Sequence, residues 1–155
     1  MSWRLLPILL ALAACMTAPA RAETPEAACA RLGTDDTLRP IPDSLVPAVN
    51  AAFGLNLPAS VAVATTVYRC DGGHVWVCNA GANLVCGKAN ASTVPGPGEV
   101  AWCRDNPDAG FIPAVATGHD TIYEWRCHAG APQIGRKLLD ADERGFIAQN
   151  WRALP

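Results

Sequence analysis

The segment YRCDGGHVWVC, residues 68–78, decides the fold because it predicts two short strands joined by a tight turn. Gly72 and Gly73 suit the two central positions of a hairpin turn, and the apolar residues that follow form the returning strand. With the two glycines in the turn, Arg69 lies opposite Trp76. This pair predicts a cation–π contact on one face of the sheet.

The two cysteines of this hairpin are expected to bond to partners elsewhere in the chain. Strand alternation with a two-residue turn points Cys70 and Cys78 to opposite faces, and a three-residue turn leaves them too far apart for a disulfide. Six cysteines permit fifteen pairings, so several sets stay open. The set that we expect is Cys78 with Cys86, Cys70 with Cys127, and Cys29 with Cys103.

The motif WRCHAG, residues 125–130, repeats the aromatic-Arg-Cys pattern of the first hairpin. It predicts a strand over residues 119–127 that ends in a turn. Residues 133–139 and 146–154 are expected to form another hairpin around the turn DADERG, although the second stretch is also compatible with a helix.

Two short helices are predicted before the first hairpin. Residues 24–33 offer a capping threonine, a first-turn proline and a terminal glycine. Residues 43–54 place apolar side chains four apart, on one face, and also end at glycine. Between them, RPIP at residues 39–42 predicts an extended linker. The alternating β-branched residues of the segment 60–70 predict a strand.

The middle of the chain predicts a long loop over residues 79–98, rich in glycine, asparagine and proline, and a short helix over residues 99–106. Taken together, the pattern predicts an α+β fold, a small disulfide-rich domain with short N-terminal helices packed on an antiparallel sheet of hairpins. We expect a single domain over residues 23–155.

The N-terminus predicts an export signal. Residues 1–22 contain an early arginine, an apolar run and the small-residue cleavage pattern Ala20-Arg21-Ala22. The run is short and interrupted by Pro7, so it does not fit a permanent membrane-spanning helix. We therefore expect a periplasmic or secreted protein.

A second interpretation of the same segment is a lipoprotein signal over residues 1–14. The sequence LAAC, residues 12–15, matches the pattern that bacterial lipoproteins carry at their lipidated cysteine. Cleavage before Cys15 would leave the protein anchored in the envelope by lipid. Contact with a membrane is expected only in this case.

Charge and cysteine content narrow the classes of partner. Removal of residues 1–22 takes away two arginines and Cys15, which leaves 10 Lys and Arg against 14 Asp and Glu and six cysteines. A net charge near −4 provides no basic field for phosphates, so we expect no nucleic acid partner. An even number of cysteines in an exported chain indicates a disulfide framework.

The sequence offers no motif for a metal or a redox centre. It contains no Cys-x-x-Cys pair, no His-Glu-x-x-His and no haem attachment motif. We expect no metal and no other cofactor, since the thiols are predicted to be consumed in disulfides.

The best catalytic candidates lie in the segment TGHDTIYEW, where His119 precedes Asp120. Neighbouring residues of a strand point to opposite faces, so Asp120 would not orient the imidazole of His119. A carboxylate from elsewhere would have to do so, with Glu99, Asp105 and Asp108 as candidates. Without a nucleophile motif, we expect a protein that is not an enzyme.

Four tryptophans remain after the predicted signal. They are expected to complete a thin core; the alternative is that one or two of them line a binding groove for a sugar or a protein. The binding residues that we expect are Arg69, Trp76, His119 and Tyr123.

The sequence YRCDGG, residues 68–73, resembles the first-strand motif of the bacterial membrane-bound inhibitors of c-type lysozyme. The resemblance implies a small exported barrel, often anchored through a lipobox cysteine. It covers only these six residues, and the inhibitory loop and the tyrosine–lysine segment of that family have no match downstream.

The sequence therefore predicts an exported, cysteine-rich protein of the bacterial envelope that binds a protein or a glycan without catalysis. A first alternative is a hydrolase centred on His119 with a carboxylate partner. A second is a structural envelope lipoprotein anchored at Cys15, or a protein like the lysozyme inhibitors.

Overall fold

The structure is a computed structural model that describes residues 22–81 and 83–155. The predicted signal segment lies outside the described residues apart from Ala22, and so does Cys15. The described chain is a mixture of short helices and antiparallel strands with three disulfides, which confirms the predicted α+β class.

The elements follow one another in a mixed order along the chain. The helices are α1 (Pro25–Leu32), α2 (Val46–Phe53), α3 (Ala59–Thr65), α4 (Pro97–Asp105) and α5 (Ala114–Thr117), with 3-10 turns η1 (Asp43–Leu45) and η2 (Ala148–Asn150). The strands are β1 (Asp35–Pro40), β2 (Thr66–Asp71), β3 (His74–Asn79), β4 (Tyr123–His128), β5 (Ala131–Lys137) and β6 (Arg152–Ala153).

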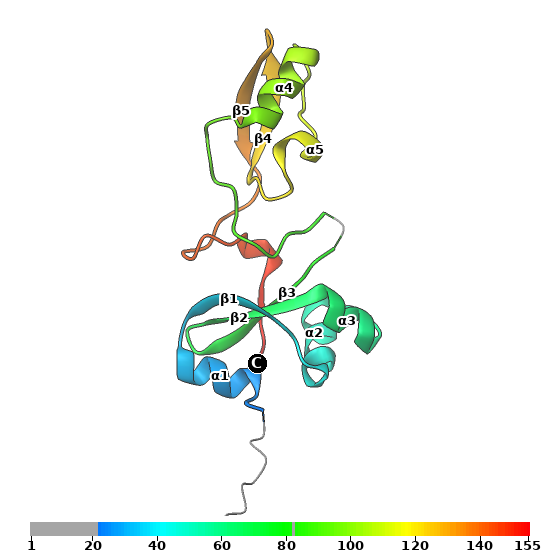
Figure 1. Ribbon diagram of the computed structural model, residues 1–155, viewed down its shortest axis with the longest axis vertical. Helices are drawn as coiled ribbons and strands as arrows, with labels where there is room; N and C mark the ends of the chain where they lie inside the picture. Colours follow the sequence, from blue (N-terminus) through cyan, green and yellow to red (C-terminus); the bar gives the residue numbers. More distant parts are fainter. Residues whose placement is uncertain (1–21, 82) are drawn as a thin grey trace, which may run out of the picture.

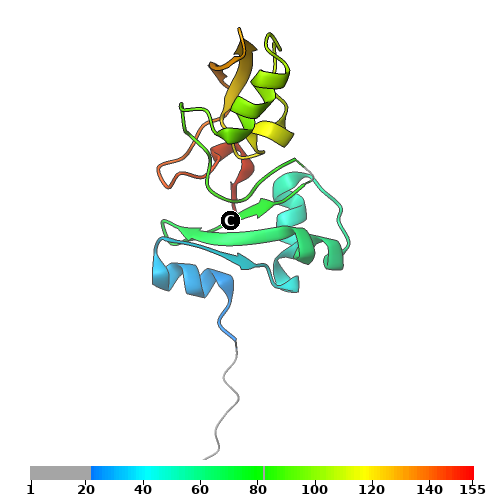
Figure 2. The ribbon, with the colours of Figure 1, turned by 45° about the horizontal axis from the view of Figure 1, so that its top comes forward.

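The elements form two lobes. The sheet lobe (residues 22–79 and 152–155) contains a four-stranded sheet in the order β1-β2-β3-β6, with helices α1, α2 and α3. The hairpin lobe (residues 97–137) contains the β4–β5 hairpin with α4 and α5 and lies at the opposite end of the molecule (Figure 1). Figures 1 and 2 show α1 on the side of the sheet that faces away from the hairpin lobe.

The central hairpin has the predicted register. Arg69 pairs with Trp76 and Cys70 pairs with Val75, around a two-residue turn. Gly72 and Gly73 have φ angles of 58° and 82°, the left-handed conformation that a type I′ turn requires at both positions. The local sequence alone therefore sets the pairing of β2 with β3.

The four-stranded sheet is open, with β1 at one edge and β6 at the other. The barrel that the lysozyme-inhibitor motif implies is therefore not formed by the described residues. In the region of β1, the sequence predicts only an extended linker over residues 39–42. Strand β1 pairs with β2 from Asp35 to Pro40, and a proline fits there because it ends an edge strand.

The predicted strand over residues 60–70 is wrong in its first half. Residues Ala59–Thr65 form α3, and the strand begins only at Thr66. Pro58 precedes the first turn, and the small side chain of Ala62 is completely buried on the inner face of the helix. The valines that alternate with alanine here fit a strand and a helix equally well. The close packing of Ala62 against the core therefore favours the helix.

The predicted hairpin between residues 133–139 and 146–154 is also wrong. Strand β5 pairs instead with β4, with Trp125 opposite Ile134. The C-terminal segment returns to the sheet lobe, where Arg152–Ala153 pair with β3. This return buries two large aromatic side chains, Phe146 and Trp151, which a hairpin in the other lobe would leave exposed.

The disulfides are Cys29–Cys70, Cys78–Cys86 and Cys103–Cys127. The pair Cys78–Cys86 is present as predicted, whereas the pairs Cys70–Cys127 and Cys29–Cys103 are wrong. Cys70 and Cys78 belong to different buried clusters, which agrees with their predicted opposite faces.

Each of the three hydrophobic clusters encloses one disulfide. Cys29 of α1 reaches Cys70 beneath the sheet, while Cys103 of α4 reaches Cys127 within the hairpin lobe. These two bonds each fasten one helix to one strand, whereas Cys78–Cys86 fastens a loop to β3.

Candidate functional site

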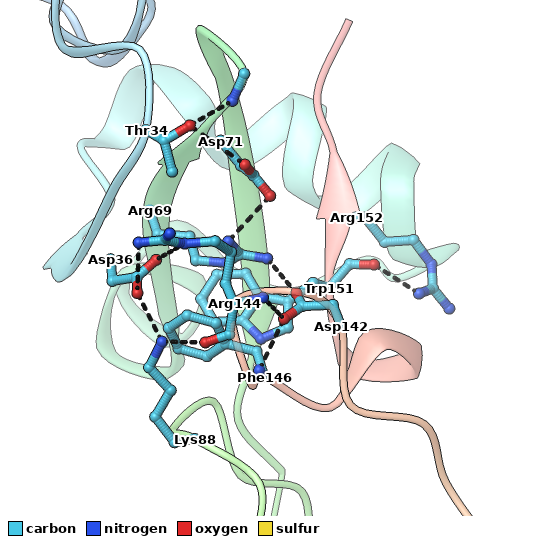
Figure 3. Close-up of polar contacts among 11 residues, drawn as sticks. Thr34, Asp36, Arg69, Asp71, Lys88, Asp142, Arg144, Phe146, Trp151 and Arg152 are labelled. Carbon is cyan, nitrogen blue, oxygen red and sulfur yellow. Dashed lines mark hydrogen bonds and ion pairs between the residues drawn. The ribbon is translucent and has the colours of Figure 1, made fainter.

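The centre of the candidate site is Arg69 on β2, whose side chain has no exposed surface. Strand alternation turns it away from the Cys70 face and toward the returning C-terminal segment (Figure 3). Its Nη1 donates to Asp71 Oδ2 at 3.2 Å, and its Nη2 donates to Asp142 Oδ2 at 2.6 Å. Two carboxylates therefore balance one buried guanidinium.

Aromatic rings surround the same guanidinium. Its central carbon lies 4.4 Å from the ring centroid of Phe146, 4.9 Å from that of Trp151 and 5.7 Å from that of Trp76. The contact of Arg69 with Trp76 confirms the predicted cation–π pair. The Nε of Arg69 is buried and has no hydrogen-bond partner among the described residues.

A second group of charges fixes the segment 142–146 against the sheet. Asp36 of β1 accepts from Lys88 Nζ at 2.6 Å and from Arg144 Nε and Nη2, each at 3.1 Å (Figure 3). Asp142 Oδ1 accepts from the backbone N–H groups of Arg144 and Phe146 at 2.9 and 2.8 Å. Three distant parts of the chain are thus joined around Arg69.

These bonds perturb Asp36. Hydrogen bonds from Arg144 and Lys88, together with their positive charges, hold the pKa of Asp36 below its ordinary value. The folded protein therefore favours the ionised carboxylate more than the unfolded chain does.

Acid is expected to remove the contribution of Asp36 to stability. The pKa of Asp36 is lower in the folded protein than in the unfolded chain. The difference in the free energy of unfolding between wild type and Asp36→Asn is therefore largest above about pH 4, and it shrinks as the pH falls below that value. Urea unfolding of both proteins across this range measures it. The control is Asp105→Asn, whose pair with Arg104 is largely exposed and should change stability little. A difference for Asp36→Asn that does not vary with pH would refute the role of this charge.

Two cavities adjoin the Arg69 cluster. The sheet-edge cavity, of about 670 Å³, is lined by Asp71, Gly72, His74, Trp76, Ala153, Leu154 and Pro155. The Arg144 cavity, of about 370 Å³, is lined by Arg69, Asp71, Trp76, Asp142, Glu143, Arg144 and Ala148. Trp76 and Asp71 line both cavities, and we call the surface that these two residues form the Trp76 wall.

The structure separates the four predicted binding residues into two places. Arg69 and Trp76 lie together at the Trp76 wall. His119 and Tyr123 line a third cavity, of about 170 Å³, beside the β4–β5 hairpin. This cavity is smaller than the other two. It lies on the hairpin lobe, whereas Arg69 lies on β2 of the sheet lobe.

No hydrogen-bonded acid and base assemble around His119 in the described chain. Its side chain is exposed, and no hydrogen bond joins it to Asp120. The other carboxylates considered bond elsewhere: Glu99 accepts from Gly96 N, Asp105 from Arg104 Nε and Asp108 from Ala129 N, each at 3.0 Å. No hydrogen bond among the described residues therefore orients the imidazole of His119 toward one of these carboxylates.

Within residues 22–81 and 83–155, no group of three or more His, Cys, Asp or Glu side chains is placed to hold a metal ion. All six cysteines there are in disulfides. The Trp76 wall and its two cavities offer a ligand the indole of Trp76 and the imidazole of His74. They also offer charged groups that form hydrogen bonds, such as Asp142 and Arg144.

Among the contributors to the site that sequence reasoning missed, Asp142 and Phe146 lie closest to the centre, in contact with the guanidinium of Arg69. Asp142 lies 73 positions from Arg69, and no local pattern joins them. The signal that was available is the turn sequence DADERG, in which an Asp side chain accepts backbone N–H groups two and four residues later. This turn places Phe146 over the guanidinium.

Comparisons with known proteins give no relative: no protein-family model, no curated protein and no solved structure matches this chain. The candidate site is therefore argued from its own geometry.

Proposed function

We propose that this protein is an exported binding module that holds a glycan or a protein at the Trp76 wall. Three disulfides are typical of an oxidising compartment outside the cytoplasm. No helix among the described residues is long and apolar enough to cross a membrane. The N-terminal segment supports delivery to the periplasm or the exterior.

The observation that carries the proposal is the position of Trp76. Its side chain is half-buried, borders two cavities and rests on a guanidinium that two carboxylates and two other rings hold in place. A large aromatic side chain that is already fixed loses little conformational entropy when a ligand covers it. Fixed tryptophans next to a pocket are the residues that most often dominate binding energy.

Replacing Trp76 by alanine is expected to weaken ligand binding about tenfold or more, because it removes the surface that both cavities share. The measurement is capture from an envelope extract by the immobilised mature protein, residues 23–155. The extract is used untreated, after protease digestion and after periodate oxidation. The two treatments distinguish a protein ligand from a glycan.

Phe111→Ala is the matched control. Phe111 is 59% exposed and lines the third cavity, so its loss tests the rival location on the hairpin lobe. Trp76→Phe keeps a ring against Arg69 and separates lost binding from lost folding. Capture that is unchanged in Trp76→Ala but reduced in Phe111→Ala would place the site on the hairpin lobe and refute the proposal.

A further inference from the structure

We infer that the ligand of the Trp76 wall is an uncharged saccharide, an inference that rests on the proposed function. It follows from three properties of the wall and its two cavities: their balanced charge, their hydrogen-bonding groups and the paired state of the β3 backbone beside Trp76.

The charges around the Trp76 wall already neutralise one another. Three cations, Arg69, Lys88 and Arg144, form ion pairs with three carboxylates, Asp36, Asp71 and Asp142. Of the charged residues that line the two cavities, only Glu143 forms no ion pair within the described chain. An anionic ligand therefore meets no unpaired Arg or Lys side chain there, and a cationic ligand meets one unpaired side-chain carboxylate.

The same groups suit a ligand that both donates and accepts hydrogen bonds. Ion-paired carboxylates such as Asp71 and Asp142 keep oxygen lone pairs that accept from hydroxyl groups. The exposed guanidinium of Arg144, whose Nε and Nη2 donate to Asp36, keeps further N–H donors for a ligand, whereas the guanidinium of Arg69 is buried and holds Trp76 in place. A sugar hydroxyl fills either role, and bonds to charged partners are the stronger kind.

Trp76 supplies the apolar part of such a site. A pyranose ring presents C–H groups on its faces and hydroxyl groups at its rim. An indole can cover the face while charged groups reach the rim. The sheet-edge cavity offers this combination, because Trp76, Ala153 and Leu154 line it together with the polar side chains of Asp71 and His74.

The backbone of β3 at the Trp76 wall is not available to an extended peptide. A peptide that adds a strand needs unpaired backbone groups. Beside Trp76 the backbone of β3 is already paired with Ala153, and Val75 O accepts from Leu154 N at 2.8 Å. The recognition at this wall therefore depends on side chains.

The test is calorimetric titration of the mature protein with two sets of probes. The first set contains uncharged oligosaccharides of glucose, mannose, galactose and N-acetylglucosamine. The second contains uronate and amino-sugar oligomers and unstructured peptides. We expect binding by at least one uncharged oligosaccharide, weakened about tenfold or more in Trp76→Ala. The affinity should change less than twofold between about 0.05 and 0.5 M salt, because no net charge is involved.

Glu143→Gln gives an independent check, since it removes the one unpaired charge without touching Arg69. A cationic ligand should lose its binding in this variant, because it loses the one unpaired side-chain carboxylate that the two cavities offer. Binding confined to charged oligomers or peptides, or no binding by the first set, overturns the inference. If a peptide or a charged oligomer binds in a manner that depends on Trp76, the proposed function survives without the inference. Binding that never depends on Trp76 overturns both.

Discussion

Replacing Arg69 by methionine is expected to lower the free energy of unfolding by about 3–5 kcal/mol. The guanidinium is fully buried, and its removal leaves the carboxylates of Asp71 and Asp142 facing aromatic rings without a cation. Methionine fills part of the volume, so the expected loss comes mainly from uncompensated charge. Urea unfolding at neutral pH, followed by tryptophan fluorescence, measures it.

Two further variants isolate the cause. Arg104→Met also breaks an Arg–Asp pair, but one that is mostly exposed, and it should change stability by less than about 0.5 kcal/mol. Adding Asp71→Asn and Asp142→Asn to Arg69→Met should recover part of the lost stability, because it removes the stranded charges. If Arg69→Met unfolds at the wild-type urea concentration, the buried guanidinium does not organise the site.

Removing the Cys29–Cys70 disulfide as Cys29→Ala with Cys70→Ala is expected to cost about 4 kcal/mol. The bond closes a loop with a sequence separation of 41, so it restricts the unfolded chain more than the other two bonds do. Among the described residues it is also the only disulfide that joins α1 to the sheet.

The other two disulfides provide matched comparisons. Their sequence separations are 24 for Cys103–Cys127 and 8 for Cys78–Cys86, for which the same relation gives about 3.5 and 2.5 kcal/mol. Urea unfolding of the three paired alanine variants, without reductant, tests this order. A larger loss for Cys78–Cys86 than for Cys29–Cys70 would show that loop length does not govern their contributions.

The parts of the fold that sequence predicts are those that local chemistry determines. The hairpin of β2 and β3 follows from two glycines in a turn that needs positive φ at both positions. Helix α1 follows from Thr24, whose hydroxyl accepts from Ala27 N at 3.3 Å, and from the proline after it. The Arg69–Trp76 contact follows directly from the hairpin register.

The parts that sequence does not predict depend on distant segments. The strand pairing of Arg152–Ala153 with β3 requires the chain to cross back from the hairpin lobe, and nothing near residue 152 signals this. The burial of Phe146 and Trp151 against Arg69 is the physical reason for the return. The same limit applies to the disulfides, since only Cys78–Cys86 closes a short loop.

The candidate site divides in the same way. Strand alternation placed Arg69 and Trp76 on one face, and the structure confirms this. Asp142 and Phe146 complete the site from a turn that no strand register includes. His119 and Tyr123 are close to each other along the chain, but they line a separate and smaller cavity.

The claim that ligand binds at the Trp76 wall is tested most directly by indole N–H resonances. In a ¹⁵N-labelled mature protein, Trp76, Trp102, Trp125 and Trp151 report on different places, and Trp102 and Trp125 belong to the hairpin-lobe cluster. Addition of the uncharged oligosaccharides is predicted to shift the Trp76 resonance and to leave that of Trp102 unchanged. A shift at Trp102 or Trp125 with Trp76 unmoved would contradict the account.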